Sequence, residues 1–250
     1  QDVAEAIAHR TPGAIFVNQF ANPANPLAHE TTTGPEILRQ MDGDVDAIVV
    51  GVGSGGTLTG IGRFMRQASP KTAMILADPE GSVLAPLIAT GRMTEAGSWA
   101  VEGIGEDFVP PNADLTLVSE TFTIPDAESF ACARELLRAE GVLAGSSSGT
   151  LLAAALRYCR SQTTPKRVVS LVCDSGAKYL SKVFNPTFLA QEGWSHPHRH
   201  GTVRDVVVSR YSEGPAVFVR PQDNLRTVFA RMRSADVSQL PIIDENGRVV

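Results

Sequence analysis

The stretch GVGSGGTLTG, residues 51–60, follows the apolar run DAIVV and precedes the helix-like segment IGRFMR. It holds five glycines within ten residues. Glycine tolerates a positive φ, so such a loop can turn several backbone N–H groups toward one anion. The helix that begins near Thr57 points the positive end of its dipole at the same place. The stretch therefore predicts a strand, a phosphate-binding turn and a helix, which together form a unit of an α/β fold.

The glycine spacing also matches the dinucleotide-binding fingerprint. Gly51, Gly53 and Gly56 have the required spacing, and Asp78 lies about 20 positions further on, where that fingerprint places its ribose-binding acid. In dinucleotide-binding folds, however, the glycine turn usually follows the first strand of its unit. Here the strand-like run AIFVNQ and a helix precede it. The position therefore favours another phosphate ligand, and a plain turn without a ligand remains an alternative.

Strand-like and helix-like segments alternate along the first part of the chain. The helical patterns include ESFACARELLRAEG (128–141) and TLLAAALRYCRSQ (150–162). The strand-like runs are AIFVNQ (14–19), DAIVVGV (46–52), AMILAD (73–78), LTLVS (115–119), GVLAG (141–145) and RVVSLVCD (167–174). Such alternation predicts a parallel sheet flanked by helices.

The composition changes near EGWSHPHRHGT (192–202), which is polar and rich in histidine. A shorter strand–helix–strand pattern follows, from VRDVVV (203–208) to PIIDENGRVV (241–250). We therefore predict a first domain over residues 1–192, a linker over 193–201 and a smaller α+β domain over 202–250. The sequence opens without methionine and closes just after a turn at Asn246-Gly247. We expect both domains to be incomplete.

Composition and charge restrict the function further. The chain has 250 residues and a formal net charge of −5, without a basic run, which argues against a nucleic-acid surface. No apolar stretch approaches the roughly 20 residues of a membrane span. The cysteines lack the spacing of a zinc site or a disulfide framework; they are Cys132, Cys159 and Cys173. We expect a cytoplasmic protein with small-molecule partners.

A second turn of small residues lies at GVLAGSSSGT (141–150), between a short apolar run and a helix. It matches the G-x-S-x-G pattern of serine hydrolases, with Ser147 as nucleophile and Asp174 as acid. The base would be one of three histidines in the polar linker, His196, His198 or His200. Their polar setting and the lack of an HGGG-like segment make the hydrolase a distant alternative. The alternating histidines could also hold a metal, but Pro197 and the polar setting favour a surface segment, and no metal is assigned.

Several motifs in order resemble one enzyme family. They are NQFANPANPLAH (18–29), TTTGPEIL (31–38), GVGSGGTLTGIGR (51–63), VEGIGEDFVPP (101–111), GVLAGSSSG (141–149) and DSGAKYLSKVFN (174–185). Together they resemble the pyridoxal-phosphate β-synthases of fold type II, the family of cystathionine β-synthase and cysteine synthase. The resemblance spans about residues 1–192. It implies a tryptophan-synthase-β-like α/β fold, truncated at its N-terminus, and pyridoxal 5′-phosphate as the cofactor.

The resemblance also implies roles for individual residues. Ser147 would form a hydrogen bond with the pyridine nitrogen of the cofactor, and Asp78 would lose its ribose-binding role. A neutral serine at that nitrogen leaves the ring a weaker electron sink than a carboxylate would, which favours β-elimination and β-replacement over transamination. The residues implied to hold the phosphate are Gly53, Ser54, Gly55, Gly56 and Thr57.

The substrate would meet a second set of residues. The resemblance implies that Gln19, with Phe20 beside it, contacts the substrate carboxylate. Gly103 and Gly105 would form a wall of the entrance, and Glu106 with Asp107 could meet an incoming ammonium group. An exposed loop amide and solvated loop charges are the plain alternatives.

Such an enzyme needs a lysine that holds the cofactor as a Schiff base. The chain has four lysines, and all read as solvated surface residues: Lys71, Lys166, Lys178 and Lys182. We therefore assign no catalytic residue. The resemblance places the lysine upstream of Gln1, and the chain alone is expected not to catalyse the reaction.

The C-terminal segment favours one family member. Residues from about 202 to 250 resemble the start of the paired regulatory module that takes its name from cystathionine β-synthase, and EGIGEDF also resembles that enzyme more than cysteine synthase. The resemblance thus implies condensation of L-serine with L-homocysteine to cystathionine. Cysteine synthesis from activated serine and sulfide is the alternative. A homodimer, and an adenosyl ligand at a complete module pair, are further implications.

Overall fold

The computed structural model describes residues 2–194, 217–235, 237 and 239–250. The chain divides into two compact units, residues 1–195 and 196–250, which are described separately. Apart from Gly193 and Trp194, the linker predicted over residues 193–201 lies outside the described residues.

The first unit is built on a four-stranded sheet with the strand order β3-β2-β1-β4. Each neighbouring pair is parallel, and in the register Val49 lies opposite Ile75 on one side and Ser170 on the other. The strands are β1 (Ala47–Val50), β2 (Ala73–Pro79), β3 (Glu120–Ile124) and β4 (Val168–Ser170). The predicted parallel α/β sheet is therefore confirmed.

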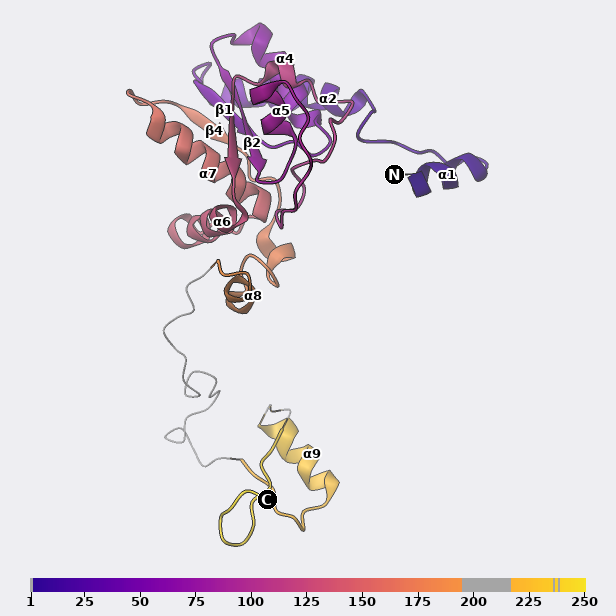
Figure 1. Cartoon of the computed structure of the whole chain (residues 1–250), viewed down its shortest axis with the longest axis vertical. Coiled ribbons are helices and arrows are strands. Elements are labelled where there is room, and N and C mark those ends of the chain that lie inside the picture. The colour runs from indigo at the N-terminus through magenta and orange to yellow at the C-terminus, as the bar shows by residue number, and fades with distance from the viewer. Residues whose placement is uncertain (1, 195–216, 236, 238) are drawn as a thin grey trace. The chain divides into compact units, whose positions relative to one another are not determined.

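Helices cover both faces of this sheet (Figure 1). Ile48 of β1 points to one face of the sheet and belongs to the same core cluster as Leu58 of α4 (Gly56–Ala68). The next residue, Val49, points to the opposite face, where Phe130 of α6 (Asp126–Glu140) belongs to the core. A strand buried on both sides explains why AIVV carries no polar residue.

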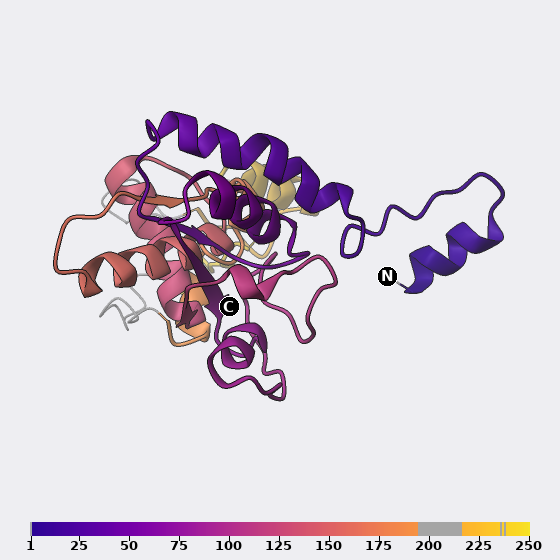
Figure 2. The same ribbon diagram turned by 90° about the horizontal axis from the view of Figure 1, so that it is seen from above.

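The first unit contains further helices, of which α1 (Asp2–Arg10) stands apart from the sheet and its helices (Figures 1 and 2). Residues 24–40 form one continuous rod, seen as the long indigo helix in Figure 2, with a π-helical turn in its middle. The rod comprises α2 (Ala24–Ala28), η1 (His29–Thr33) and α3 (Gly34–Gln40). The others are α5 (Leu84–Thr90), α7 (Ser146–Ser161), α8 (Pro186–Gln191) and the short turns η2 (Leu115–Leu117) and η3 (Gly176–Tyr179).

Three of the predicted strands do not form. Residues 14–19 are irregular and leave Ile15 85% exposed, because β-propensity yields a strand only where a neighbouring strand pairs with it. At 115–119 the chain forms η2 instead, since the Asp114 side chain accepts the Thr116 N–H, and β3 starts at Glu120. Residues 141–145 contribute only a single bridge, between Ala144 and Ser175.

The second unit is small in its described part. It contains α9 (Leu225–Ser234), preceded by Asn224, whose side chain accepts the Thr227 N–H. Val219 forms a parallel bridge with Ile242, and an antiparallel bridge joins residues 243 and 249. This agrees with the strand–helix–strand pattern predicted after residue 216, whereas the run VRDVVV lies outside the described residues.

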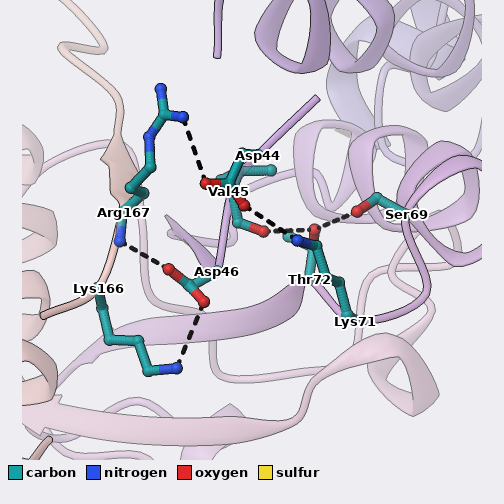
Figure 3. Close-up of polar contacts among 8 residues, drawn as sticks. All are labelled: Asp44, Val45, Asp46, Ser69, Lys71, Thr72, Lys166 and Arg167. Atoms are coloured by element: carbon teal, nitrogen blue, oxygen red, sulfur yellow. Dashed lines mark hydrogen bonds and ion pairs between the residues drawn. The ribbon is translucent and has the colours of Figure 1, made fainter. Parts of the chain in front are cut away.

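A network of charges joins the starts of three strands (Figure 3). Asp44 pairs with Lys71, which precedes β2, at 3.0 Å and with Arg167, which precedes β4, at 3.4 Å. Asp46, just before β1, accepts the Arg167 backbone N–H at 2.8 Å and pairs with Lys166 at 3.3 Å. The backbone hydrogen bond first, and Lys166 in addition, lower the pKa of Asp46. The network therefore holds the strand starts in register.

This network predicts an acid-dependent contribution to stability. Because the pKa of Asp46 is lowered in the folded state, its carboxylate stabilises the fold above the unfolded pKa, and the effect is lost as the pH falls through the folded pKa. We expect Asp46→Asn to lower the melting temperature at pH 7 and to make it less sensitive to pH between about 5 and 2. Thermal unfolding across that range, with the exposed loop variant Glu95→Gln as control, checks this. Parallel pH curves for wild type and Asp46→Asn would contradict it.

Candidate functional site

A cavity of about 450 Å³ lies where β1 and β4 end and where α4 and α7 begin. The turn 53–57 lines it from one side and Ser147 from another, and Gln19 and Gly103 also line it. Residues 171–174, directly after β4, form a further part of its lining. Ligands of open α/β sheets bind outside the carboxyl ends of the strands, which is the position of this cavity.

The glycine turn has the features of an anion site. Gly55 has a φ of +84° and directly precedes the 13-residue helix α4, whose N-terminus receives no hydrogen bond from a capping side chain. The first N–H groups of α4 are therefore available to a ligand. The turn is also confined from outside, since a Cβ on Gly55 would lie 2.7 Å from Ala113, and one on Gly56 would lie 1.9 Å from the Asn25 side chain. Larger residues would displace the backbone.

Asn25 joins the glycine turn to the segment that contains Gln19. Its Nδ2 donates to Ser54 Oγ at 2.9 Å and to the Gln19 carbonyl at 2.8 Å. Asn112 Nδ2 donates to the same carbonyl at 2.9 Å. The backbone of Gln19 is thus fixed beside the cavity although its side chain is exposed.

His29 is a cavity residue that the sequence did not reveal. In the π-helical turn η1, its Nε2 lies 3.2 Å from Thr57 Oγ1 and its Nδ1 lies 2.9 Å from Thr33 Oγ1. Burial lowers the pKa of His29, which favours the neutral ring at pH 7. A neutral ring joins the two hydroxyls as donor to one and acceptor from the other. His29 therefore holds the Thr57 hydroxyl in place at the start of α4.

The three serines at the start of α7 are all buried, but they have different partners. Ser146 Oγ accepts the Glu102 N–H at 3.1 Å, and Ser148 Oγ accepts the Cys173 N–H at 3.0 Å. Ser147 is the member of the run that lines the cavity. The two outer serines thus have scaffold roles, while the middle one faces the space a ligand would occupy.

Asp174 contacts a tyrosine and a lysine, whereas the acid of a hydrolase triad would contact a histidine. Its Oδ2 accepts the Tyr179 hydroxyl at 2.8 Å and pairs with Lys178 at 3.6 Å. Burial first, and Asp174 in addition, raise the pKa of Tyr179 to about 12. The three linker histidines lie outside the described residues. In the described part of the chain, nothing joins Ser147 to an acid–base pair.

The loop of residues 102–107 forms another wall. Gly103 and Gly105 both have a φ of +86°, and the Gly105 N–H donates to the Val52 carbonyl at 2.9 Å. Trp99 Nε1 donates to the Ile104 carbonyl at 3.1 Å, which fixes the loop on its other side. Gly103 lines the cavity. Three predicted substrate residues are not among the residues that line it: Phe20, Gly105 and Glu106.

Asp78 lies inside the protein and not at a ligand. Its side chain is fully buried, and Oδ2 accepts the Ala85 N–H at 2.8 Å, at the start of α5. Burial raises the pKa of Asp78, partly offset by that hydrogen bond. The hydrogen bond to the start of α5 gives Asp78 a structural role, so its presence does not require a bound ribose.

All four lysines of the chain form ion pairs with carboxylates. Lys71 and Lys166 belong to the network of Figure 3, and Lys182 pairs with Glu102. Lys178 pairs with Asp174. None of the four is among the residues that line the cavity. Among the described residues no group of three potential metal ligands occurs, and no helix there is long and apolar enough to cross a membrane.

The residues present fit a small phosphorylated aromatic cofactor such as pyridoxal phosphate. The turn 53–57 offers backbone N–H groups at a helix start, and Ser147 offers one neutral hydroxyl elsewhere in the same cavity. A dinucleotide would call for a second phosphate site and a ribose-binding acid, and Asp78 is buried away from that role.

Comparisons with known proteins show the family of the chain. The model of the family "Pyridoxal-phosphate dependent enzyme" matches residues 1–174, and that of the "CBS domain" matches residues 203–250. The chain is 34% identical over 252 residues to cystathionine beta-synthase of Oryctolagus cuniculus, covering 99% of this chain and 46% of that protein. It is 38% identical over 195 residues to cystathionine beta-synthase of Apis mellifera, covering 78% of this chain and 38% of that protein.

A third relative has a different name. Cysteine synthase A of Escherichia coli (strain K12) is 40% identical over 184 residues, covering 72% of this chain and 57% of that protein. The chain thus spans between 38% and 57% of the length of these relatives. The family, cofactor class and C-terminal domain expected from the sequence are confirmed by these matches. The chain belongs to the pyridoxal-phosphate-dependent enzymes of fold type II and carries a CBS-domain sequence after residue 202.

Proposed function

We propose that the protein containing this sequence catalyses β-replacement on L-serine, with L-homocysteine as the thiol, to give cystathionine. One observation carries the proposal: the free N–H groups of the turn 53–57 and the hydroxyl-bearing Ser147 line the same cavity. This is the pair of contacts that a phosphorylated pyridine needs. When bound, the cofactor supplies the electron sink for loss and replacement of the β-substituent.

The side chains of this site divide the work. The N–H groups of residues 53–57 bind the phosphate, and His29 holds the Thr57 hydroxyl beside it. Ser147 forms a hydrogen bond with the ring nitrogen without bringing a charge. A neutral partner does not stabilise a protonated ring, which favours replacement at the β-carbon over transamination. Gln19, whose backbone is fixed by Asn25 and Asn112, contacts the substrate carboxylate.

The choice of cystathionine synthesis rests on the extent of similarity. The match to the rabbit cystathionine beta-synthase covers 99% of the chain, whereas that to cysteine synthase A covers 72%. The additional part corresponds to the CBS domain over residues 203–250. Cysteine synthesis from activated serine and sulfide is the alternative, because the site described here serves both reactions.

Other parts of the proposal concern the whole protein. None of the four lysines lines the cavity, so the lysine that binds the cofactor would come from outside this sequence. We also propose a cytoplasmic homodimer, and an adenosyl ligand where two CBS domains form a pair. Sedimentation of the full-length protein and calorimetric titration with adenosyl compounds test these two proposals.

The first prediction from this function concerns the substrates of the full-length protein. We expect kcat/KM for L-serine with L-homocysteine to exceed that for O-acetylserine with sulfide. Steady-state assays with both pairs at one pH measure this. A reversed preference would transfer the assignment to cysteine synthesis.

The second prediction concerns Ser147. We expect Ser147→Ala to lower β-replacement by the worth of a hydrogen bond, about 1 to 3 kcal/mol in activation free energy. Ser147→Asp should stabilise a protonated ring nitrogen, change the absorption spectrum of the bound cofactor and reduce the share of β-replacement. Steady-state kinetics and absorption spectra of the full-length variants give both results.

Two comparisons make that experiment decisive. The neighbouring Ser146→Ala and Ser148→Ala remove scaffold hydrogen bonds, so they should act mainly on stability and leave the cofactor spectrum unchanged. Covalent capture of Ser147 by a serine-directed phosphonate, with no change of the cofactor spectrum in Ser147→Asp, would instead support a hydrolase.

A further inference from the structure

The rod of residues 24–40 lies directly against the first turns of α4. A glycine makes this close approach possible, because a Cβ on Gly60 would lie 2.2 Å from the Pro26 carbonyl oxygen and 2.5 Å from His29 Cβ. Gly60 follows Thr57 by three residues, so both lie on the same side of the helix. The contact that buries Gly60 therefore also brings the His29 ring to the Thr57 hydroxyl.

The His29 ring joins two hydroxyl groups of the cavity lining. Its Nε2 lies 3.2 Å from Thr57 Oγ1, its Nδ1 lies 2.9 Å from Thr33 Oγ1, and all three residues line the cavity. Among the described residues, neither hydroxyl has a further hydrogen-bond partner. The other two threonines of the turn η1 differ, because Thr31 and Thr32 donate to backbone carbonyls of the preceding turn. The η1 turn thus commits one hydroxyl, that of Thr33, to the ring.

A neutral imidazole carries a single N–H, so two arrangements of these hydrogen bonds are possible. In the first, Nδ1–H donates to Thr33 and the Thr57 hydroxyl donates to Nε2, which leaves only oxygen lone pairs of Thr57 toward the cavity. In the second, the Thr33 hydroxyl donates to Nδ1 and Nε2–H donates to Thr57 Oγ1. The Thr57 hydrogen is then free to donate to a ligand. Only the second arrangement adds a donor for an anion beside the N–H groups of residues 53–57.

We propose that His29 is a positioning residue for the phosphate of the ligand: its Nε2–H donates to Thr57 Oγ1, and the Thr57 hydroxyl donates to the phosphate. This inference rests on the proposed binding of the cofactor phosphate by residues 53–57. The hydrogen bonds from Thr33 through His29 and Thr57 then all point toward the anion, and bonds in such a chain strengthen one another. His29 thereby favours a phosphorylated ring compound over the same compound without phosphate.

The first test observes the His29 ring directly. In the full-length protein labelled with ¹⁵N-histidine, the nitrogen chemical shifts distinguish a protonated from an unprotonated ring nitrogen. At about pH 8, where burial keeps the ring neutral, we expect the complex with pyridoxal phosphate to carry the proton on Nε2 and none on Nδ1. His9, which is exposed in α1, is the internal control and should keep its shifts on binding.

The second test compares pyridoxal phosphate with pyridoxal in titrations of the full-length apoprotein. A glutamine amide nitrogen reaches about as far as Nε2, whereas an asparagine amide nitrogen reaches only about as far as Nδ1. We therefore expect His29→Asn to raise the Kd of pyridoxal phosphate about tenfold and His29→Gln to raise it less. The Kd of pyridoxal should stay within about twofold in both variants.

A matched control comes from the same turn. Thr31→Val removes a hydroxyl that donates to the Leu27 carbonyl at 2.9 Å and does not line the cavity. It should leave the Kd of both compounds within about twofold. The nitrogen shifts of the wild-type protein need no substitution, so they decide the proposal even where a variant fails to fold.

The outcomes separate this inference from the proposed function. A proton on Nδ1 in the complex, alone or together with one on Nε2, would overturn the inference, as would equal losses of affinity for both compounds in His29→Asn. Wild-type protein that binds pyridoxal as tightly as pyridoxal phosphate would overturn the phosphate site and the inference with it. Tight binding of pyridoxal phosphate without cystathionine formation would instead overturn the proposed reaction alone. A proton on Nε2, with a loss confined to the phosphorylated compound, supports the inference.

Discussion

The site depends on one constraint, the parallel pairing of β1 with β4. Parallel strands buried on both faces end at the same edge of the sheet, so the loops that follow them meet there. Val49 pairs with Ser170 across about half of the chain. This pairing places the glycine turn after β1 beside residues 171–174 after β4, and the start of α7 joins them in the cavity lining. Segments that are distant in sequence thus become one site through backbone hydrogen bonds.

At this edge of the sheet, close packing by neighbouring residues determines the shape of the glycine turn. Asn25 and Ala113 press against Gly56 and Gly55, and a Cβ on Gly53 would lie 2.5 Å from the Gly103 carbonyl. The glycines are therefore needed because of neighbours on the protein side as well as for an anion on the open side. A turn confined in this way presents its N–H groups in a fixed arrangement before any ligand binds, which lowers the reorganisation that binding requires.

Local signals predicted the parts of the fold that local physics determines. Some signals can be recognised without knowledge of distant contacts. They are the apolar run at β1, the glycines before α4 and the periodicity of α6 and α7. The run at 14–19 has similar β-propensity but no strand beside it, so it stays irregular. The site was predictable at the two small-residue turns, where composition itself is unusual. The contact of His29 with Thr57 spans 28 residues and depends on how the rod of residues 24–40 lies against α4, which no pattern in the sequence encodes.

The charges of the cavity follow from the same architecture. Neither lysine nor arginine is among the described residues that line it, and burial favours the neutral form of His29. The attraction for a phosphate must therefore come from backbone N–H groups and the dipole of α4, which keep their charge distribution at any pH at which the fold persists. The two acidic side chains in the lining, Glu102 and Asp174, form ion pairs with Lys182 and Lys178, which do not line the cavity. Backbone dipoles would thus hold an anionic cofactor without a lysine or arginine in the cavity lining.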